Sequence, residues 1–380
     1  MNDKHVLLKT NETVFLTLLN QVILNKKIYP LVLLLWVAIY SGKAQDIHYS
    51  QFYNAPLNIN PALTGVFGGD IRFMGNYRSQ WRRTPVDYTT FTGAVDMKFI
   101  NRTATKGFFS GGLTFNYDQA GYSKLNLINL GLNGSYTRQL SNKFFVSFGA
   151  MVAANQRRFQ TDDLTFDSGF DTGTGTYDPS LGSGESFSST SRFFLDFGGG
   201  INFRLQGLDA AVMIDRLEKR SKLDFGIGVF HITQPDQSFY ENYESPLTIR
   251  IAPYALGVVQ LGPNLDAVAN LVGQFQEPYR EYLGMIGGRL YLSRKLGRQI
   301  AVQLGVGYRF SEFSGLSLSR DSYVPAIEVH YNQWRAGFSY DVNTSDFNVT
   351  TQKRGGPEFS IRYVLRKIRP LPYFKHCPLI

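Results

Sequence analysis

Residue types that could carry catalysis or hold a metal ion are dispersed along this chain. The only cysteine is Cys377, which excludes an intramolecular disulfide and a multi-cysteine metal site. His48, His231 and His330 are far apart in the sequence, and His376 beside Cys377 makes a pair too small to hold an ion alone. Neither a G-x-S-x-G elbow nor an H-E-x-x-H motif occurs. We therefore predict no catalytic residue, no metal site and no cofactor.

One loop is rich in acidic residues that could bind a cation. The stretch "TDDLTFDSGFDTGTGTYDPSLGSGESFSSTS" places carboxylates among Gly and Ser, at Asp162, Asp163, Asp167, Asp171, Asp178 and Glu185. Oxygen ligands on a flexible loop could bind calcium, but the fixed spacing of an EF-hand is missing. We favour a solvated surface loop over a calcium site.

The composition is typical of pleated strands. Of 380 residues, 43% are hydrophobic, 14% aromatic and only 18% charged, with 37 Gly, 22 Tyr and 30 Phe. The mean hydropathy of −0.17 excludes a bundle of membrane helices. The net charge is +9, yet Lys and Arg are scattered along strand-like segments rather than gathered in one stripe. We therefore exclude nucleic acid as a partner.

Alternation with a period of two dominates from Asp70 onward, so successive side chains point to opposite faces. In "DIRFMGNYRSQW", Phe73 and Tyr77 share one face while Arg72 and Arg78 share the other. Three more segments repeat the pattern: "FTGAVDMKF", "RFFLDFGGGINFRL" and "QIAVQLGVGYRF". Because the polar faces mix charges with glycines and aromatics recur near strand ends, we expect the apolar faces to contact lipid.

The sequence predicts an all-β protein, a transmembrane antiparallel up-and-down β-barrel of about 14 strands spanning residues 70–366. An even number is required when both ends of the chain lie in the periplasm. Several connections are nearly absent or about two residues long, whereas residues 158–191, 234–247, 311–321 and 342–355 form longer ones. We assign the short connections to the periplasmic side and the long ones to the cell exterior, with residues 206–221 as an exception. The expected strands are 70–81, 89–99, 107–118, 125–140, 143–157, 192–205, 222–233, 248–262, 265–276, 281–293, 299–310, 322–332, 333–341 and 356–366.

The N-terminus carries an export signal. Two lysines precede an apolar run from Ile28 to Tyr40, which is shorter than the roughly 20 residues of a membrane helix. Gly42 and Ala44 fit a cleavage site, so we expect residues 1–44 to be a signal peptide cut before Gln45. An uncleaved N-terminal anchor is the alternative. Export leaves residues 45–69 as a periplasmic N-terminal segment and residues 367–380 as a periplasmic C-terminal tail.

The segment "AQDIHYSQFYNAPLNINPALTGVF" is too irregular for a helix or strand, and Pro61 after Asn60 disfavours helix there. Together with "IRFMGNYRSQWR" it resembles the start of PorP/SprF-type outer-membrane proteins of the type IX secretion system. "HITQPDQSF", "YDVNTSDF" and "RGGPEFSIRY" extend the resemblance in the expected order. The most specific part is the family-motif segment, which includes Ser50, Gln51, Phe52, Tyr53, Asn60 and Pro61.

The resemblance implies an outer-membrane barrel of fourteen strands that is needed to secrete or surface-anchor proteins with type IX C-terminal signals. The implied partners are the secretion machinery and a cargo protein, such as a large surface adhesin of gliding motility. A cargo domain would dock on the long loops, and we single out Gln234, Pro235, Gln237, Ser238 and Phe239 as a contact loop. The irregular segment would plug the lower barrel mouth or contact the secretion machinery.

Two other functions remain open from the residues alone. A small-solute outer-membrane channel is the main alternative, and an outer-membrane hydrolase is the other. Near the C-terminus, basic residues could either bind an acidic partner or form a charged end exposed to solvent. These residues are Arg362, Arg366, Lys367, Arg369 and Lys375.

Overall fold

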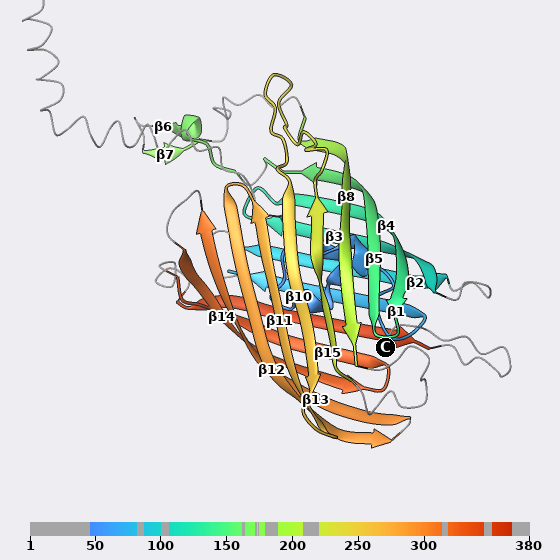
Figure 1. Cartoon of the computed structure of the whole chain (residues 1–380). Helices are drawn as coiled ribbons and strands as arrows, with labels where there is room; N and C mark the ends of the chain where they lie inside the picture. The colour runs from blue at the N-terminus through green and yellow to red at the C-terminus, as the bar shows by residue number, and fades with distance from the viewer. Residues whose placement is uncertain are drawn as a thin grey trace, which may run out of the picture. The chain divides into compact units, whose positions relative to one another are not determined.

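Long antiparallel strands make up most of the structure, a computed structural model shown in Figure 1. It describes residues 46–81, 87–99, 106–161, 164–171, 173, 175–178, 189–207, 220–295, 297–313, 318–345 and 352–366. No helix within these ranges has the length and apolar character needed to cross a membrane. The predicted cleavage site at Ala44 and Gln45 and the predicted tail 367–380 lie outside the described residues.

Fourteen of the described strands form one closed barrel in which neighbours along the chain pair with each other and the first pairs with the last. The predicted fold class is therefore confirmed. The strands are β1 (Ile71–Gln80), β2 (Tyr88–Phe99), β3 (Gly107–Ala120), β4 (Leu125–Ser141), β5 (Phe144–Arg158), β8 (Ser191–Gln206), β9 (Lys222–Phe230), β10 (Arg250–Gln260), β11 (Leu265–Gln276), β12 (Tyr279–Lys295), β13 (Arg298–Phe313), β14 (Ser319–Tyr331), β15 (Trp334–Asn343) and β16 (Arg354–Leu365). A small hairpin, β6 (Phe170–Asp171) and β7 (Thr176–Tyr177), lies in the connection between β5 and β8.

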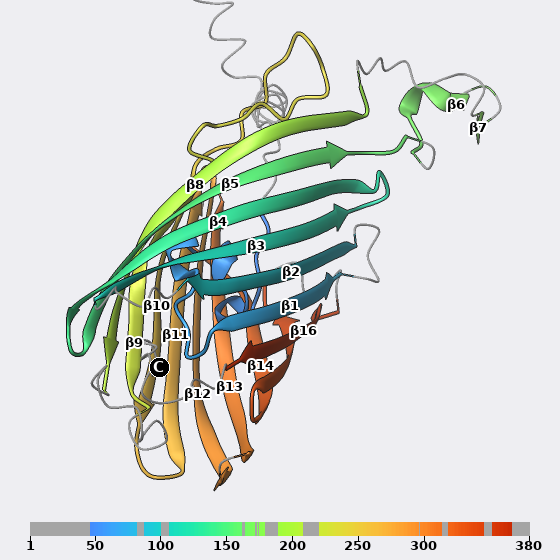
Figure 2. The same ribbon diagram turned by 90° about the vertical axis from the view of Figure 1, so that its right-hand side faces the viewer.

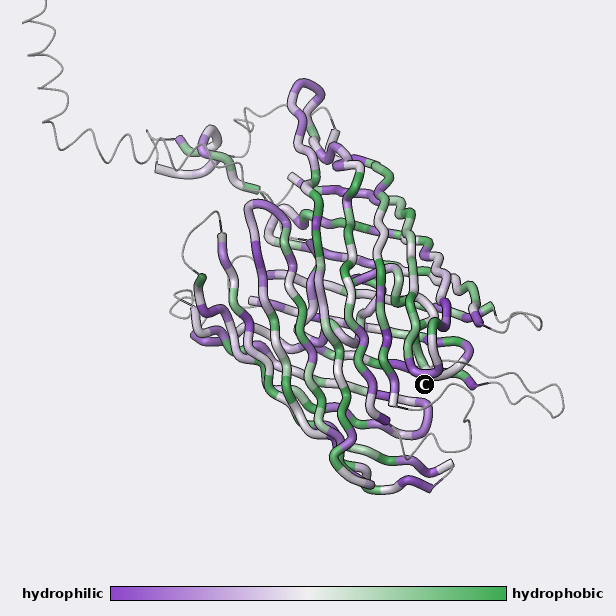
Figure 3. The backbone as a smooth tube through the Cα atoms, viewed as in Figure 1, coloured by the Kyte–Doolittle hydropathy of each residue, from purple (hydrophilic) through white to green (hydrophobic). Residues whose placement is uncertain are grey.

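Each strand turns its apolar face outward and its polar face into the lumen. In β1, Phe73 is 46% exposed while Arg72 and Arg78 are 3% and 1% exposed. Hydrophilic and hydrophobic positions alternate along the strands in Figure 3. A soluble barrel would place its apolar side inside, so this arrangement is that of a barrel surrounded by lipid. Exposed aromatics gather where strands begin or end, among them Phe99, Phe109, Tyr331 and Trp334.

The two ends of the barrel differ in their connections. The short-turn end carries residues 142–143, 261–264 and 332–333, and it is also where β1 begins and β16 ends. The long-loop end carries residues 231–249, and β5 ends and β8 begins there. This asymmetry agrees with the predicted topology, in which the short turns face the periplasm. The observed strand ends differ from the predicted ones by up to three residues: β13 ends at Phe313 rather than at residue 310, and β14 begins at Ser319 rather than at residue 322. β9 ends at Phe230 rather than at residue 233, because His231 adopts a left-handed backbone conformation with φ of 57°.

Candidate functional site: a plug in the barrel lumen

Residues 47–70, which we call the plug, run through the inside of the barrel. The blue segment in Figure 2 lies within the ring of strands. Its first residues bond near the long-loop end, where the Nη1 of Arg78 donates to the carbonyl of His48 (2.7 Å). Its last residue, Asp70, donates its N–H to the carbonyl of Leu365 (2.9 Å) at the short-turn end. The plug therefore crosses the lumen lengthwise.

The plug is built from three single turns of 3₁₀-helix, η1 (Phe52–Asn54), η2 (Pro56–Asn58) and η3 (Pro61–Leu63). Proline opens two of them, since its fixed φ suits the first position of a helix and its missing N–H is not needed there. Asn60 caps η3 by accepting the N–H of Ala62 on its Oδ1 (2.8 Å). The "NINPAL" sequence therefore specifies a tight, capped turn rather than an unstructured linker.

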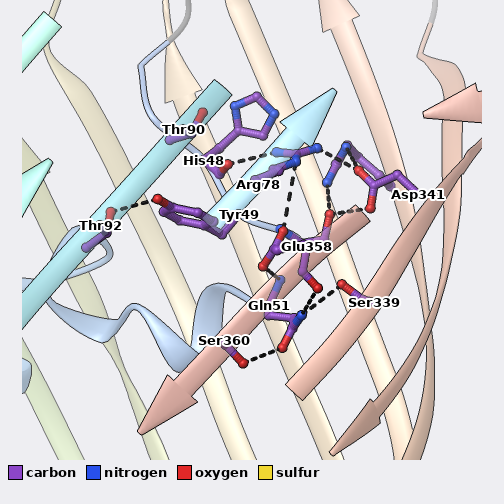
Figure 4. Close-up of polar contacts among 12 residues, drawn as sticks. His48, Tyr49, Gln51, Arg78, Thr90, Thr92, Ser339, Asp341, Glu358 and Ser360 are labelled. Atoms are coloured by element: carbon purple, nitrogen blue, oxygen red, sulfur yellow. Dashed lines mark hydrogen bonds and ion pairs between the residues drawn. The ribbon is translucent and has the colours of Figure 1, made fainter. Parts of the chain in front are cut away.

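The start of the plug is fixed to β16 by a carboxylate. The Glu358 oxygens accept the backbone N–H groups of Ser50 (2.7 Å) and Gln51 (2.8 Å). The Gln51 side chain donates to Ser339 Oγ and to the carbonyl of Glu358, both at 3.0 Å, and accepts from Ser360 Oγ (2.7 Å). Figure 4 shows this cluster. Gln51 and Glu358 are fully buried, so the donors and acceptors of this buried backbone are satisfied by side chains of the wall.

A buried ionic group lies beside this anchor. Asp341 accepts from Arg78 Nη2 (2.6 Å), from Arg309 Nη1 (3.0 Å) and from Ser50 Oγ (2.6 Å). Arg309 Nη2 also donates to Ser50 Oγ (2.5 Å). The carboxylate thus joins β1, β13 and β15 to the plug. Two guanidinium groups that are 1–2% exposed depend on it for their counter-charge, together with Glu281 and Glu358.

Asn60 clamps the middle of the plug to the opposite wall. Its Nδ2 donates to the carbonyls of Ile201 (2.9 Å) on β8 and Ile227 (3.1 Å) on β9, and to the Tyr254 hydroxyl (3.1 Å) on β10. Carbonyls in mid-strand normally face a neighbouring strand. Asn60 can reach them because the nearby wall positions include Gly200 and Gly228, which have no side chain in the way.

The far end of the plug is held by a second ion pair. Asp96 accepts two bonds from Arg72 (2.9 and 2.7 Å), and its Oδ2 also accepts the N–H of Gly65 (2.7 Å). Lys98 donates to the carbonyl of Phe67 and lies 4.6 Å from the centre of its ring. Gly65 has a φ of +73°, and a Cβ there would meet Ser110 Oγ at 2.0 Å, so only glycine fits this turn.

The plug also supplies an apolar core inside an otherwise polar lumen. Phe52, Ile59, Leu63 and Val66 are 3–5% exposed and pack together. The wall side chains in the same cluster come from both sides of the barrel: Phe108, Phe145, Ala252, Tyr254, Val272 and Leu283. The lumen is therefore packed like a protein interior over this length rather than filled with water.

Glycines on the wall make room for the plug, and this gives a first prediction. A Cβ at Gly228 would lie 2.1 Å from the Ile59 carbonyl oxygen, and one at Gly149 would lie 2.3 Å from the Ala62 nitrogen. Since both contacts are with backbone, Gly228→Ala and Gly149→Ala should displace the plug at a cost of about 1–3 kcal/mol. Hydrogen exchange of the amides in residues 56–65 should become about ten- to hundredfold faster.

Two other strand glycines provide matched controls. A Cβ at Gly134 or at Gly288 would meet nothing within 4 Å. Gly134→Ala and Gly288→Ala should leave exchange in the plug unchanged. Equal acceleration in all four variants would mean that the plug does not press on Gly149 and Gly228.

The family-motif residues all belong to the plug. Residues 45–69 were expected to precede the first strand and either to plug the barrel mouth or to contact the secretion machinery, and the described part packs inside the barrel. The reason is that its amide and hydroxyl groups match inward-facing polar residues of strands far away in the sequence. Ser50, Gln51, Phe52, Asn60 and Pro61 are buried there, and Tyr53 is partly buried. Sequence reasoning missed the charged residues of the wall that hold the plug, which are Arg78, Asp96, Arg309, Asp341 and Glu358.

The predicted contact loop lies at the long-loop end, but several of its residues are structural. Ser238 is buried, Gln237 bonds to Arg157, and the Phe239 ring lies 4.6 Å from that of Phe159. Gln234 is exposed and Pro235 is partly buried. The larger exposed apolar side chains of this loop are Ile232, Tyr240 and Tyr243, at 50%, 40% and 58% exposure.

Asp236 holds this loop together, which predicts a pH dependence. It accepts the N–H groups of Ser245 (2.8 Å) and Ser238 (3.1 Å) and pairs with Arg192 (2.8 Å). Slight burial favours a higher pKa for Asp236, but these donors and the guanidinium outweigh it and lower the pKa below its ordinary value. A lowered pKa means that the stabilisation is present above about pH 4 and is lost as the pH falls below it.

The measurement is hydrogen exchange at the Ser238 and Ser245 amides, corrected for the intrinsic effect of pH. Both amides should be protected at pH 6 and lose protection toward pH 3. Asp236→Asn should reduce this difference between the two pH values. Equal protection of the wild-type loop at pH 3 and pH 6 would contradict the assignment.

The three described histidines each contact a different carboxylate. His231 Nδ1 lies 2.9 Å from Asp196, His330 Nε2 lies 3.0 Å from Glu328, and His48 Nε2 lies 3.8 Å from Glu281. In the part of the chain that the structure describes, no group of three or more His, Cys, Asp or Glu side chains is arranged to hold a metal ion. Asp162, Asp163 and Glu185 of the acidic loop lie outside that part.

Comparison with known proteins decides the family. The model for "Type IX secretion system membrane protein PorP/SprF" matches residues 41–363, which covers the plug and nearly all of the barrel. The chain belongs to the PorP/SprF family. No curated protein sequence matches it.

Among solved structures, the PorP/SprF chain is similar to distant barrels. A Pseudomonas aeruginosa FadL homologue has a TM-score of 0.43 at 13% identity, covering 80% of this chain and 91% of that one. The TodX deltaS2S3 mutant monoaromatic hydrocarbon channel also scores 0.43, at 10% identity, covering 82% and 94%. The translocator domain of the autotransporter NalP from Neisseria meningitidis scores 0.32 at 9% identity, covering 83% and 96%. Likenesses this remote leave the function to be argued from the chain's own residues.

Proposed function

We propose that this PorP/SprF protein is a non-catalytic, plugged outer-membrane barrel that is needed to secrete or surface-anchor a protein with a type IX C-terminal signal. Family membership supports a role in type IX secretion, and the apolar exterior supports a place in the outer membrane. The proposed cargo is a large surface adhesin. The proposed partners are this cargo and the secretion machinery.

The observation that carries the proposal is the plug. Its hydrogen bonds and apolar contacts reach strands on every side of the lumen, from β1 to β16. A channel for small solutes needs a continuous water-filled passage through the lumen. In this barrel the plug fills the cross-section of the lumen. A barrel closed in this way acts through its surfaces, so we assign cargo binding to the long-loop end.

The exposed side chains of residues 231–249 suit that role. Ile232, Tyr240 and Tyr243 put apolar and aromatic area on a loop that Asp236 holds in shape. Aromatic anchors on a shaped surface are what binding interfaces use most. The loop is also rigidly attached, because Arg157 on β5 and Arg192 on β8 bond to it.

The test is affinity purification of the full-length protein from outer membranes in mild detergent, followed by quantitative mass spectrometry. We expect enrichment of a protein with a type IX C-terminal domain or of a machinery component. The Ile232→Ser/Tyr243→Ser variant should lose the cargo while the barrel remains folded. Recovery of the barrel alone, together with ion conductance by the intact protein, would favour the channel instead.

A further inference from the structure

Three cationic side chains line one cavity in the lumen, and among the described residues no carboxylate lies within ion-pair distance of them. The cavity measures about 410 Å³ and lies between the plug and the wall at the short-turn end, where Asn332, Gln333 and Arg366 line it. Lys222, Arg335 and Arg362 also line it. We propose that this cavity binds a phosphate-bearing anion, a ligand site that is independent of the proposed secretion role.

Strand register brings two of the cations together. Arg335 on β15 and Arg362 on β16 are directly opposite each other, and His330 on β14 is opposite Arg335. Their strand neighbours Trp334 and Ile361 are 48% and 51% exposed on the outer face, so both arginines point inward. Like charges in directly opposite positions destabilise a sheet. This pair therefore calls for an anion between or beside the two guanidinium groups.

Two of the three carboxylates near the cavity are paired with other arginines, and the third accepts from an amide and contacts a histidine. Asp224 pairs with Arg204 (2.7 Å), Asp266 pairs with Arg220 (2.8 Å), and Glu328 bonds to His330 and Asn54 (both 3.0 Å). Among the described residues, none of these acids lies within ion-pair distance of the three cations. The Nε of Arg362 is buried and has no hydrogen-bond partner among those residues either.

The chemistry of the lining selects the ligand class. Lys222, Arg335 and Arg362 are partly buried. Cations held around one cavity repel each other, and a multivalent anion between them would offset that repulsion. Guanidinium groups bind the oxygens of phosphate in pairs, and a lysine adds a point charge. The volume exceeds that of bare phosphate and falls in the range of small-molecule sites, about 300–1,000 Å³. The ligand is therefore either free phosphate or a small phosphate ester from the periplasmic side.

Isothermal titration and thermal unfolding of the full-length protein in detergent test this, with inorganic phosphate and glycerol 3-phosphate as probes. Phosphate should raise the melting temperature of the wild type. Arg335→Gln/Arg362→Gln should bind about tenfold or more weakly. Without phosphate this double variant should unfold at the same or a higher temperature, since a repulsion is removed, which distinguishes lost binding from misfolding.

Arg280→Gln is the matched control, because Arg280 is 51% exposed at the long-loop end and pairs with Glu312. It should bind both probes like the wild type. Tighter binding of glycerol 3-phosphate supports a phosphate ester as the ligand, and equal binding supports free phosphate. Absence of binding, equal binding by the double variant, or binding of an aspartate-rich peptide in place of phosphate would overturn the proposal.

Discussion

Asp341→Ala is expected to lower the free energy of unfolding by about 3–5 kcal/mol, the cost of removing one partner from a buried ion pair. The variant leaves Arg78 and Arg309 facing each other with less negative charge, and it removes the acceptor of the Ser50 hydroxyl. Urea-induced unfolding of the barrel in lipid vesicles measures the loss.

Asp167→Ala is the control for this prediction. Asp167 is exposed, in the connection between β5 and β8. Its replacement should change the free energy of unfolding by no more than about 0.5 kcal/mol. If the two alanine variants unfold at the same urea concentration, the buried ionic group does not stabilise the plugged barrel.

Deletion of residues 47–65 is expected to turn a closed barrel into an open one. The apolar core of the lumen would lose Phe52, Ile59 and Leu63, and water would fill the polar space left behind. In planar bilayers the wild type should conduct no more than a protein-free membrane, and the deletion variant should give discrete conductance steps.

Since a deletion can fail to fold, a point variant provides an independent route. In Gly200→Val every residue of the plug is kept, but a Cβ at Gly200 would lie 2.2 Å from Asn60 Oδ1. This variant should show intermittent conductance, and Gly288→Val, at a position with open space, should show none. Large steady conductance by the intact wild type would contradict a closed lumen.

The barrel could be predicted from the sequence because its signal is local. In β1 the alternation of Phe73 and Tyr77 with Arg72 and Arg78 sets both the strand and the side that faces lipid. The lengths of the connections between strands then indicate which end of the barrel faces the periplasm. Strand ends were less certain, as β9 shows, because a single residue with positive φ can end a strand without changing the hydrophobic pattern.

Plugging of the barrel mouth was one of two roles expected for this segment, but the residues that the plug contacts could not be predicted, because they are distant in the sequence. Asn60 and Pro61 indicate a capped turn locally, but nothing near them encodes the carbonyls of Ile201 and Ile227. Ser50 and Asp341 are separated by 291 positions in the chain. Only the charged residues on the inward faces indicated that something binds inside the barrel, since a carboxylate such as Asp96 or Glu358 in the wall needs a partner.

The cationic cavity could not be predicted either, because its residues are also far apart in the sequence. Lys222, Arg335 and Arg362 look like scattered charges in the sequence, and the net charge alone does not place them. Barrel closure sets Arg335 opposite Arg362 and brings Lys222 to the same cavity. Cationic residues that are far apart in the sequence can therefore gather at one cavity of the folded barrel.

We propose that this PorP/SprF protein displays a specific cargo rather than conducting solutes. The most direct measurement is the amount of each type IX C-terminal-signal protein on the surface of cells that lack the chain, by surface labelling and mass spectrometry. We expect at least one such protein to be lost from the surface and restored by the wild type, but not by Ile232→Ser/Tyr243→Ser. An unchanged set of surface proteins in cells lacking the chain would contradict the claim.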